Sequence, residues 1–306
     1  MKPKQLTKIQ IREIAKKHFS SPPNSIIYLG QGENNSNYIL KIKENEYILR
    51  ISMRGRDPIS EHNFLHKIDH PSVPKSLIYD KSRTIIPYYY TIQEKKEGKH
   101  LKRFSKKRLI QHVQNLAKVH ISTKQDVGSY DIIAFIKKEI AEWSIQNAEN
   151  YTLFEEFILR EALANKTYFQ NINLSIINTD VLPPNMLFTK KNVNYIDWEW
   201  AQVSDPARDV AVFYYPGLSL SPWQINLSKE RERLYLKTYQ KYTKDSSLFK
   251  RVYIWQLIQA YMDLSYFSWK VNNWDKDIQS SLPKSVYETS KKKLYSFLRK
   301  QMRKAS

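Results

Sequence analysis

The sequence predicts an α+β fold of two lobes, a mainly β N-terminal lobe followed by a mainly α C-terminal lobe. With 306 residues, the chain is long enough for a large core and for one or two domains. Before residue 97 it carries short runs rich in Ile and Tyr that partly alternate, as strands do. Glu97-Gly98 interrupts this pattern, and afterwards apolar residues recur at helical spacing. We therefore expect lobes at 1–97 and 98–306.

The N-terminal lobe is expected to begin with an amphipathic helix that carries Leu6, Ile9, Ile14 and Phe19. The runs that follow it are bounded by polar or Gly-containing turns, and the polar turn at 43–46 makes a hairpin of two of them. The expected elements are strands over Ser25 to Gly30, Asn37 to Lys43 and Glu46 to Ile51, a helix over Pro58 to Ile68, and strands over Val73 to Tyr79 and Thr84 to Glu94.

The C-terminal lobe is expected to be helical apart from one inserted hairpin. The hairpin has two short strands, Met186 to Thr189 and Val193 to Ile196, joined by a polar turn. His120 ends the first helix, and we interpret it as a packing or hydrogen-bonding residue. Apolar spacing predicts helices over Leu109 to His120, Ile133 to Trp143, Phe154 to Phe169, Lys229 to Tyr242 and Val252 to Trp269.

The composition excludes several classes of site. There is no Cys, which rules out disulfides, thiolate metal sites and a Cys nucleophile. The most apolar stretch, 252–269, is interrupted by Gln256, Gln259 and Asp263, so it predicts a buried helix and not a membrane span. The N-terminus lacks the apolar core of a signal peptide. A cytoplasmic protein with no membrane span is therefore expected.

The formal net charge of +20 favours an anionic partner such as nucleic acid, but the charge is unevenly distributed. The runs 99–108 and 291–304 are basic and contain no acid. They predict either a nucleic-acid contact or solvated helix faces. Between Ile177 and Asp209 the balance reverses, with five acidic residues against three basic ones. An acidic segment in a basic protein indicates a site for a metal or an ammonium group.

The acidic segment begins with a stiff loop, INTDVLPPNML at 177–187. Its two Pro residues restrict the backbone and exclude a helix interior or a central strand. The predicted hairpin starts after Asn185 and ends at Asp197, so these two side chains are expected to be neighbours, with Asp180 beside them. Oxygen ligands from two side chains, completed by water and phosphate, are typical of Mg²⁺. A carboxylate close by can orient a hydroxyl group or accept its proton, and such chemistry depends on rigid positioning.

At these residues the sequence resembles the aminoglycoside phosphotransferase and choline kinase-like small-molecule kinases. The resemblance covers most of the chain from Ile26 onward but is specific only in three motifs. They are Asn178-Thr179-Asp180 with Asn185 five residues later, Ile196-Asp197-Trp198-Glu199, and Asp205-Pro206-Ala207-Arg208-Asp209. The resemblance implies a bilobal protein-kinase-like fold, catalysis by Asp180, and Mg²⁺ held by Asn185 and Asp197.

One motif departs from the family, because Asn178 stands where the family has His. That position mostly braces the loop by hydrogen bonding, and an Asn can make part of those bonds. The departure therefore concerns the geometry of the loop and not the chemistry at Asp180.

The resemblance also implies an ATP site in the N-terminal lobe. The turn GQGENNSNY at 30–38 resembles the nucleotide-covering loop, in which glycines let backbone N–H groups approach phosphate oxygens. Arg50 occupies the place of the phosphate-pairing cation, and Glu61 matches the acid that holds it. Residues 94–98 match the hinge that meets the adenine. The implied cofactor-binding residues are Gly30, Gly32, Asn35, Ser36, Arg50, Glu61, Glu94, Lys95 and Lys96.

The acceptor is expected to be a small-molecule alcohol, and the resemblance places its pocket in the helical lobe. The acidic segment, with 7 Trp and 21 Tyr in the chain, favours a cationic or amino-bearing alcohol. We rank a choline- or ethanolamine-like alcohol first, a sugar second and an aminoglycoside third. A catalytically inactive kinase-fold protein and a basic nucleic-acid-binding protein remain as alternatives. Candidate acceptor-binding residues are Glu199, Trp200, Tyr214, Tyr215 and Trp223.

Overall fold

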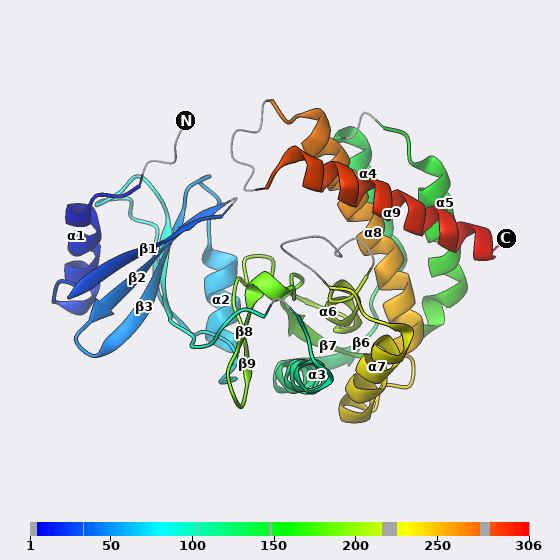
Figure 1. The fold of residues 1–306 in the computed structure, drawn as a ribbon, viewed down its shortest axis with the longest axis horizontal. Helices are drawn as coiled ribbons and strands as arrows, with labels where there is room; N and C mark the ends of the chain where they lie inside the picture. Colours follow the sequence, from blue (N-terminus) through cyan, green and yellow to red (C-terminus); the bar gives the residue numbers. More distant parts are fainter. Residues whose placement is uncertain are drawn as a thin grey trace.

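The computed structural model describes residues 5–32, 34–101, 103–146, 149–215, 225–275 and 282–305. The chain folds into a sheet-containing N-terminal part and a helical C-terminal part, which lie side by side in Figure 1. The predicted α+β fold is therefore confirmed. One hydrophobic core lies between the N-terminal sheet and its first helix, and a larger core fills the helical part.

The N-terminal part is built on a five-stranded antiparallel sheet with the strand order β1-β2-β3-β5-β4. The strand predicted over 84–94 is shorter than expected, because only its last five residues pair with β3 and β4. Pro87 lies in the unpaired portion and has no N–H to donate to a ladder. The strands are β1 (Ser25–Gln31), β2 (Asn35–Ile42), β3 (Asn45–Ser52), β4 (Ser76–Asp80) and β5 (Tyr90–Glu94).

Side-chain alternation along β3 decides what each face of the sheet does. Leu49 and Ile51 point into the core covered by α1 (Lys8–Phe19), whose Ile11 and Ile14 are buried against the sheet. Arg50, between them, must point to the opposite face. There it meets α2 (Ile59–Lys67), which lies between the sheet and the helical part in Figure 1. The period of two therefore directs Arg50 toward the C-terminal part.

In the C-terminal part, helices surround a three-stranded sheet, ordered β10-β7-β6, and the predicted hairpin β8–β9. The three-stranded sheet was not predicted. The elements are α3 (Lys106–Ser122), β6 (Lys124–Gly128), α4 (Ile132–Gln146), α5 (Thr152–Asn165), the 3₁₀ turn η1 (Lys166–Phe169), β7 (Ile172–Ile177), the 3₁₀ turn η2 (Pro183–Asn185), β8 (Met186–Phe188), β9 (Val193–Tyr195), β10 (Gln202–Ser204), α6 (Ala207–Val212), α7 (Lys229–Thr243), α8 (Leu248–Asn272) and α9 (Lys284–Ala305).

The basic run 291–304 lies in α9, whose Leu294 and Leu298 are buried against the helical core. The other basic run, 99–108, extends from the connection between the two parts into the start of α3. Among the described helices, none combines the length and the apolar character needed to cross a membrane.

The connection between the two parts is held against the hairpin. Gly98 has φ +136°, and a Cβ there would lie 2.8 Å from the backbone carbon of Leu187. The next residue, Lys99, exchanges two backbone hydrogen bonds with Phe188 of β8, at 3.0 and 2.9 Å. Only glycine fits this approach without strain, so the predicted lobe boundary coincides with a position where the backbone of the linker touches the hairpin.

His112 of α3 supports the hairpin from below. Its Nδ1 lies 3.1 Å from the hydroxyl of Tyr195, and the hydroxyl of Tyr235 lies 3.3 Å from its Nε2. Tyr195 also donates to the carbonyl of His112 at 3.0 Å, so a neutral imidazole, donating from Nδ1 and accepting at Nε2, satisfies every group. Burial lowers the pKa of His112 to about 3, and the nearby His120 adds to the shift.

We expect the free energy of unfolding to fall below pH 6.5 because of His112. The folded state keeps this imidazole neutral while the unfolded chain binds a proton, so stability is greatest above the unfolded pKa and is lost as the pH falls toward 3. Between pH 7 and pH 5 the advantage of the wild type over His112→Asn should shrink by about 2 kcal/mol, at about 1.4 kcal/mol per pH unit. Urea unfolding at the two pH values measures this, and a constant difference would contradict the assignment.

Candidate active site

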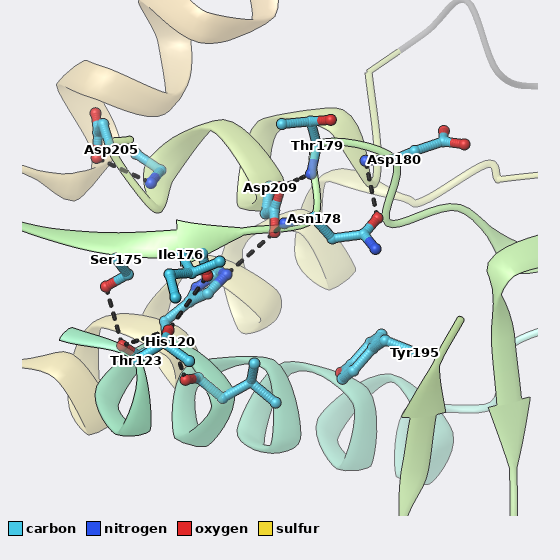
Figure 2. Close-up of polar contacts among 12 residues, drawn as sticks. His120, Thr123, Ser175, Ile176, Asn178, Thr179, Asp180, Tyr195, Asp205 and Asp209 are labelled. Atoms are coloured by element: carbon cyan, nitrogen blue, oxygen red, sulfur yellow. Dashed lines mark hydrogen bonds and ion pairs between the residues drawn. The ribbon is translucent and has the colours of Figure 1, made fainter. Parts of the chain in front are cut away.

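The loop that follows β7 is held by one buried carboxylate. Asp209 of α6 accepts hydrogen bonds from the backbone N–H groups of Asn178, at 2.9 Å, and Thr179, at 2.7 Å. His120 lies 3.1 Å from the same carboxylate and binds the hydroxyl of Tyr239 through its other nitrogen, at 2.7 Å. Figure 2 shows Asp209 between His120 and the loop. His120 thus has the hydrogen-bonding position that the sequence predicted.

The carboxylate of Asp209 stabilises a backbone that is otherwise unfavourable. Thr179 has φ +69°, in the left-handed region where a β-branched residue is strained. Its hydroxyl donates to the carbonyl of Trp200 at 3.2 Å, which adds a second restraint. The sharp turn directs the next side chain, Asp180, away from the helices and toward the open side in Figure 2.

Asn178, the residue that departs from the family, braces the loop with both ends of its amide. Its Nδ2 donates to the carbonyl of Asp197 at 3.0 Å, and its Oδ1 accepts from the N–H of Asp180 at 3.0 Å. The side chain is buried. An amide can therefore tie the loop to the end of the hairpin at this position.

Asp180 and Asn185 are in direct contact. Nδ2 of Asn185 donates to Oδ2 of Asp180 at 2.7 Å and to its carbonyl at 3.1 Å. The two prolines between them form the turn η2, which closes the loop. Burial raises the pKa of Asp180 to about 7, and the negative charge of Asp197 adds to the shift. Asp180 is therefore a carboxylate whose proton affinity suits proton transfer near neutral pH.

The hairpin brings Asp197 to the same place, as the sequence predicted. The N–H of Ile196 donates to the carbonyl of Asn185 at 3.0 Å, which joins the two ends of the hairpin. Asp197 has φ +61°, and its side chain remains about one-third exposed, at 33%. Asp180, Asn185 and Asp197 thus converge at one edge of the helical part.

Arg50 reaches this edge from the N-terminal sheet. Its Nη2 lies 2.5 Å from Oδ1 of Asp197 and 3.3 Å from Oε2 of Glu199, and its Nε lies 3.3 Å from Oε2 of Glu61. Burial alone would lower the pKa of Arg50, but the charges of Asp197, Glu61 and Glu199 outweigh it and raise that pKa. Nη2 of Arg50 thus binds two carboxylates of the C-terminal part, and Glu61 on α2 pairs with Nε of the same guanidinium.

Glu199 joins the site from the opposite direction to the one expected of an acceptor-binding residue. Its two carboxylate oxygens accept from Nδ2 of Asn34, at 3.1 Å, and Nδ2 of Asn35, at 2.8 Å. Arg56 donates to the Glu199 carbonyl at 3.0 Å and stacks over Trp200, with its guanidinium carbon 3.7 Å from the ring centroid. Glu199 and Trp200 therefore contact the predicted nucleotide turn.

The turn between β1 and β2 has the open backbone that the sequence predicted. Gly30 has φ +140°, and a Cβ there would have no atom within 4 Å, so it is conformation and not space that requires glycine. The N–H of Gly32 donates to the carbonyl of Asn35 at 2.9 Å, which closes the turn, and Ser36 begins the buried part of β2.

The side chains of the predicted hinge are occupied by ion pairs on the surface. Lys95 pairs with Glu46 at 2.9 Å and with Glu97 at 2.7 Å, and Lys96 pairs with Glu94 at 2.9 Å. These exposed pairs contribute little to stability. They agree with a hinge that meets a ligand through its backbone.

The remaining acceptor candidates are mostly buried. Tyr214 and Tyr215 are 9% and 1% exposed, and the Tyr214 ring packs edge-on against Tyr235 at 5.6 Å. Trp223 lies outside the described residues. The motifs did not point to Asp263 of α8, whose charge lies within electrostatic reach of Asp180. The signal was present, because Asp263 interrupts the most apolar stretch of the sequence.

Comparisons with known proteins agree with this geometry. A model of the phosphotransferase enzyme family matches residues 25–244. A comparison with curated proteins found no match. The aminoglycoside phosphotransferase APH(4)-Ia superposes with a TM-score of 0.66 at 14% identity, covering 96% of this chain and 99% of that one. Other structures of that enzyme are ternary complexes of hygromycin B with AMP-PNP or ADP.

Two further structures have kinase activities in their names. Choline kinase LicA from Streptococcus pneumoniae superposes with a TM-score of 0.64 at 17% identity, covering 94% of this chain and 98% of that one. The Plasmodium vivax ethanolamine kinase does so with a TM-score of 0.63 at 15% identity, covering 90% and 83%. At these identities the likeness establishes the fold.

We expect Asn178→Ala to lower kcat by about 10- to 100-fold in an ADP-release assay, with little change in nucleotide affinity. The variant loses two buried hydrogen bonds that hold Asp180 and Asp197, worth about 0.5–1.5 kcal/mol each. Asn173→Ala is the matched control, since Asn173 is exposed on β7, in the strand that leads to the same loop. Equal activity of the two variants would mean that Asn178 does not position the loop.

Proposed function

The chain belongs to the phosphotransferase enzyme family, and on that basis we propose that it moves the γ-phosphoryl group of ATP to a hydroxyl of a small amino-bearing alcohol. Family membership confirms the resemblance that the three motifs predicted, and it makes the protein a small-molecule phosphotransferase. The observation that carries the finer proposal is the convergence of Asp180, Asn185 and Asp197 from the C-terminal part with Arg50 from the N-terminal part.

The nucleotide is proposed to bind between the sheet and the catalytic loop. Arg50 would bind phosphate oxygens, because a guanidinium presents a planar fork of donors. The turn at 30–36 would cover the phosphates, and the backbone at 94–96 would meet the adenine. Support comes from APH(4)-Ia, which has a similar fold and holds AMP-PNP or ADP in its complexes.

Asn185 and Asp197 are proposed to hold Mg²⁺. No described residue hydrogen-bonds to Oδ1 of Asn185, and one oxygen of Asp197 remains outside the Arg50 contact, so both offer a hard oxygen ligand. Among the described residues, no group of three or more His, Asp or Glu side chains is arranged as a metal site. The other ligands would then be water and phosphate oxygens, and the ion would neutralise charge on the phosphates.

Asp180 is proposed to orient the acceptor hydroxyl and accept its proton. The acceptor oxygen forms the new bond to the γ-phosphorus, the bond from that phosphorus to the β,γ-bridging oxygen breaks, and ADP leaves. The hydroxyl proton passes to Asp180 late, because the transition state is loose and requires little early base assistance. Asn185 and the backbone at Asn178 keep the carboxylate in place.

An amino-bearing alcohol is proposed because the acceptor end of the site is acidic. Asp180 and Asp263 lie within electrostatic reach of each other, so a bound ammonium group would relieve their repulsion. The fold is shared with choline and ethanolamine kinases as well as with an aminoglycoside phosphotransferase. A sugar or an aminoglycoside acceptor therefore remains the second candidate.

We expect Asp197→Ala to abolish the stabilisation that Mg²⁺ and a nonhydrolysable ATP analogue give to the wild type. A ligand that binds only the folded state adds about 2.7 kcal/mol at 100 times its Kd. Thermal unfolding with and without ligand measures the increment, so any loss of intrinsic stability in the variant cancels. Asp69→Ala is the control, because the Asp69 side chain is 96% exposed. An undiminished increment in Asp197→Ala would show that the metal assignment is wrong.

We expect Asp180→Ala to reduce turnover by roughly 10²–10⁴-fold, the usual contribution of general acid–base catalysis, with nearly unchanged ATP binding. The assay is ADP release over choline, ethanolamine, neutral sugars and aminoglycosides, run beside the variant. Turnover of neutral sugars alone would exclude an amino-bearing acceptor. No turnover above that of Asp180→Ala on any alcohol would favour an inactive kinase-fold protein.

A further inference from the structure

The described part of the chain buries three arginine side chains, Arg50, Arg208 and Arg251, and treats one of them differently. Arg50 pairs with carboxylates, as described above. Arg251 pairs with Asp205 at 2.9 Å and Asp245 at 2.6 Å. Arg208 of α6 is only 7% exposed, yet within the described residues its guanidinium forms no ion pair or hydrogen bond, and its Nε is buried without a partner. A buried charge is costly when it is left unpaired.

Aromatic rings offset part of that cost. The guanidinium carbon of Arg208 lies 5.2 Å from the ring centroid of Phe135 on α4 and 5.3 Å from that of Trp255 on α8. Cation–π contacts of this kind hold a guanidinium in place, but they leave its N–H groups without acceptors. The arrangement fixes the position of a cation and keeps its hydrogen bonds available.

Two carboxylates lie within electrostatic reach of Arg208 without pairing with it, Glu139 on α4 and Asp263 on α8. Carboxylate charges outweigh burial and raise the pKa of Arg50 and of Arg251, whereas at Arg208 burial prevails and lowers the pKa. The three arginines therefore differ in whether the protein itself supplies the counterion.

Asp263 connects Arg208 to the catalytic loop. Its carboxylate interacts with the charges of both Asp180 and Arg208. Its one hydrogen bond from the described residues comes from Nε2 of Gln259, one turn earlier on α8, at 3.0 Å. The residue is partly exposed. Helices α6 and α8 pack against each other, so the order of charges away from Asp180 is a carboxylate and then a guanidinium.

We propose that Asp263 and Arg208 recognise the acceptor, and that the acceptor carries an ammonium and a carboxylate group besides its hydroxyl, as a hydroxyl-bearing amino acid does. The proposal rests on the proposed function and narrows its substrate class. The hydroxyl lies at Asp180, the ammonium group at Asp263, and the carboxylate at Arg208, where it supplies the missing counterion.

Other acceptor classes match these charges less well. A purely cationic alcohol would leave Arg208 unpaired and bring a second cation close to it. A hydroxy acid would place its carboxylate near Asp180 and Asp263 with no ammonium group to separate them. A neutral sugar would leave all three charges without partners, and leaving buried charged groups unpaired is what makes such sites selective.

Matched pairs of alcohols test the proposal. L-Serine and ethanolamine differ by one carboxylate, as do L-homoserine and 3-amino-1-propanol, while 3-hydroxypropanoate lacks the amine. We expect kcat/KM from ADP release to be 10- to 100-fold higher for each amino acid than for its amino alcohol. Arg208→Gln should abolish that ratio, and Arg208→Lys should retain part of it. Asp263→Asn should lower kcat/KM for the amine-bearing acceptors and leave 3-hydroxypropanoate unaffected.

Arg160→Gln is the matched control, because Arg160 also stacks over a ring, that of Phe157 at 5.6 Å, but its side chain is 60% exposed on α5. It should leave the ratio unchanged. If Arg208→Gln fails to fold, Arg208→Lys and Asp263→Asn still report the ratio.

A preference for amino alcohols over their amino acid partners would overturn the proposal. So would an unchanged ratio in a folded Arg208→Gln variant, because Arg208 would then serve only in packing. If no alcohol is turned over above the level of Asp180→Ala, the proposed function itself fails. In that case, thermal stabilisation by L-serine but not by ethanolamine would still support the binding site, and stabilisation by neither would refute it.

Discussion

The geometry of the site depends on the hydrogen bonds that the buried carboxylate of Asp209 accepts. Asp209 has no exposed surface, and two backbone N–H groups and His120 satisfy it. These bonds hold Thr179 in a left-handed conformation that its β-branched side chain disfavours. Asp209 is in turn anchored through α6, which begins beside Asp205, and Asp205 is bound by Arg251 and Trp255 of α8. The position of Asp180 is thus set by the longest buried helix of the C-terminal part.

The N-terminal sheet meets this anchored loop at one side chain. Because strand residues alternate between faces, burying Leu49 and Ile51 under α1 leaves Arg50 on the face that points to the helical part. There it binds Asp197, whose backbone carbonyl is also bound by Asn178. The linker at Gly98 lies against the same hairpin that carries Asp197. Two independent contacts with one hairpin therefore fix how the two parts of the chain approach each other.

The residues that the sequence identified are those whose neighbours are set by local geometry. Asp180, Asn185 and Asp197 belong to a short loop and a tight hairpin, so chain connectivity alone predicts that they meet. Arg208 and Asp263 belong to different helices, and only the packing of α6 on α8 brings them together. The three-stranded sheet was missed for the same reason, because β6 and β10 are short strands that pair with β7 across long stretches of sequence. Glu199 was expected to face the acceptor, but nothing in its local pattern shows that Asn34 and Asn35 bind it.

The distribution of charge separates the two ends of the site. A net charge of +20 attracts anions to the molecule as a whole, which favours capture of a nucleotide by long-range electrostatics. Close to the catalytic loop, short-range contacts decide instead. At the phosphate end, Arg50 is already paired with carboxylates, so a nucleotide must compete with Asp197 and Glu199 for the same guanidinium. At the other end, the Arg208 guanidinium has no pair, so an anionic group that reaches it displaces no protein contact. The two buried cations therefore differ in the cost of accepting an anion, and that difference keeps phosphate binding reversible where phosphate must enter and leave.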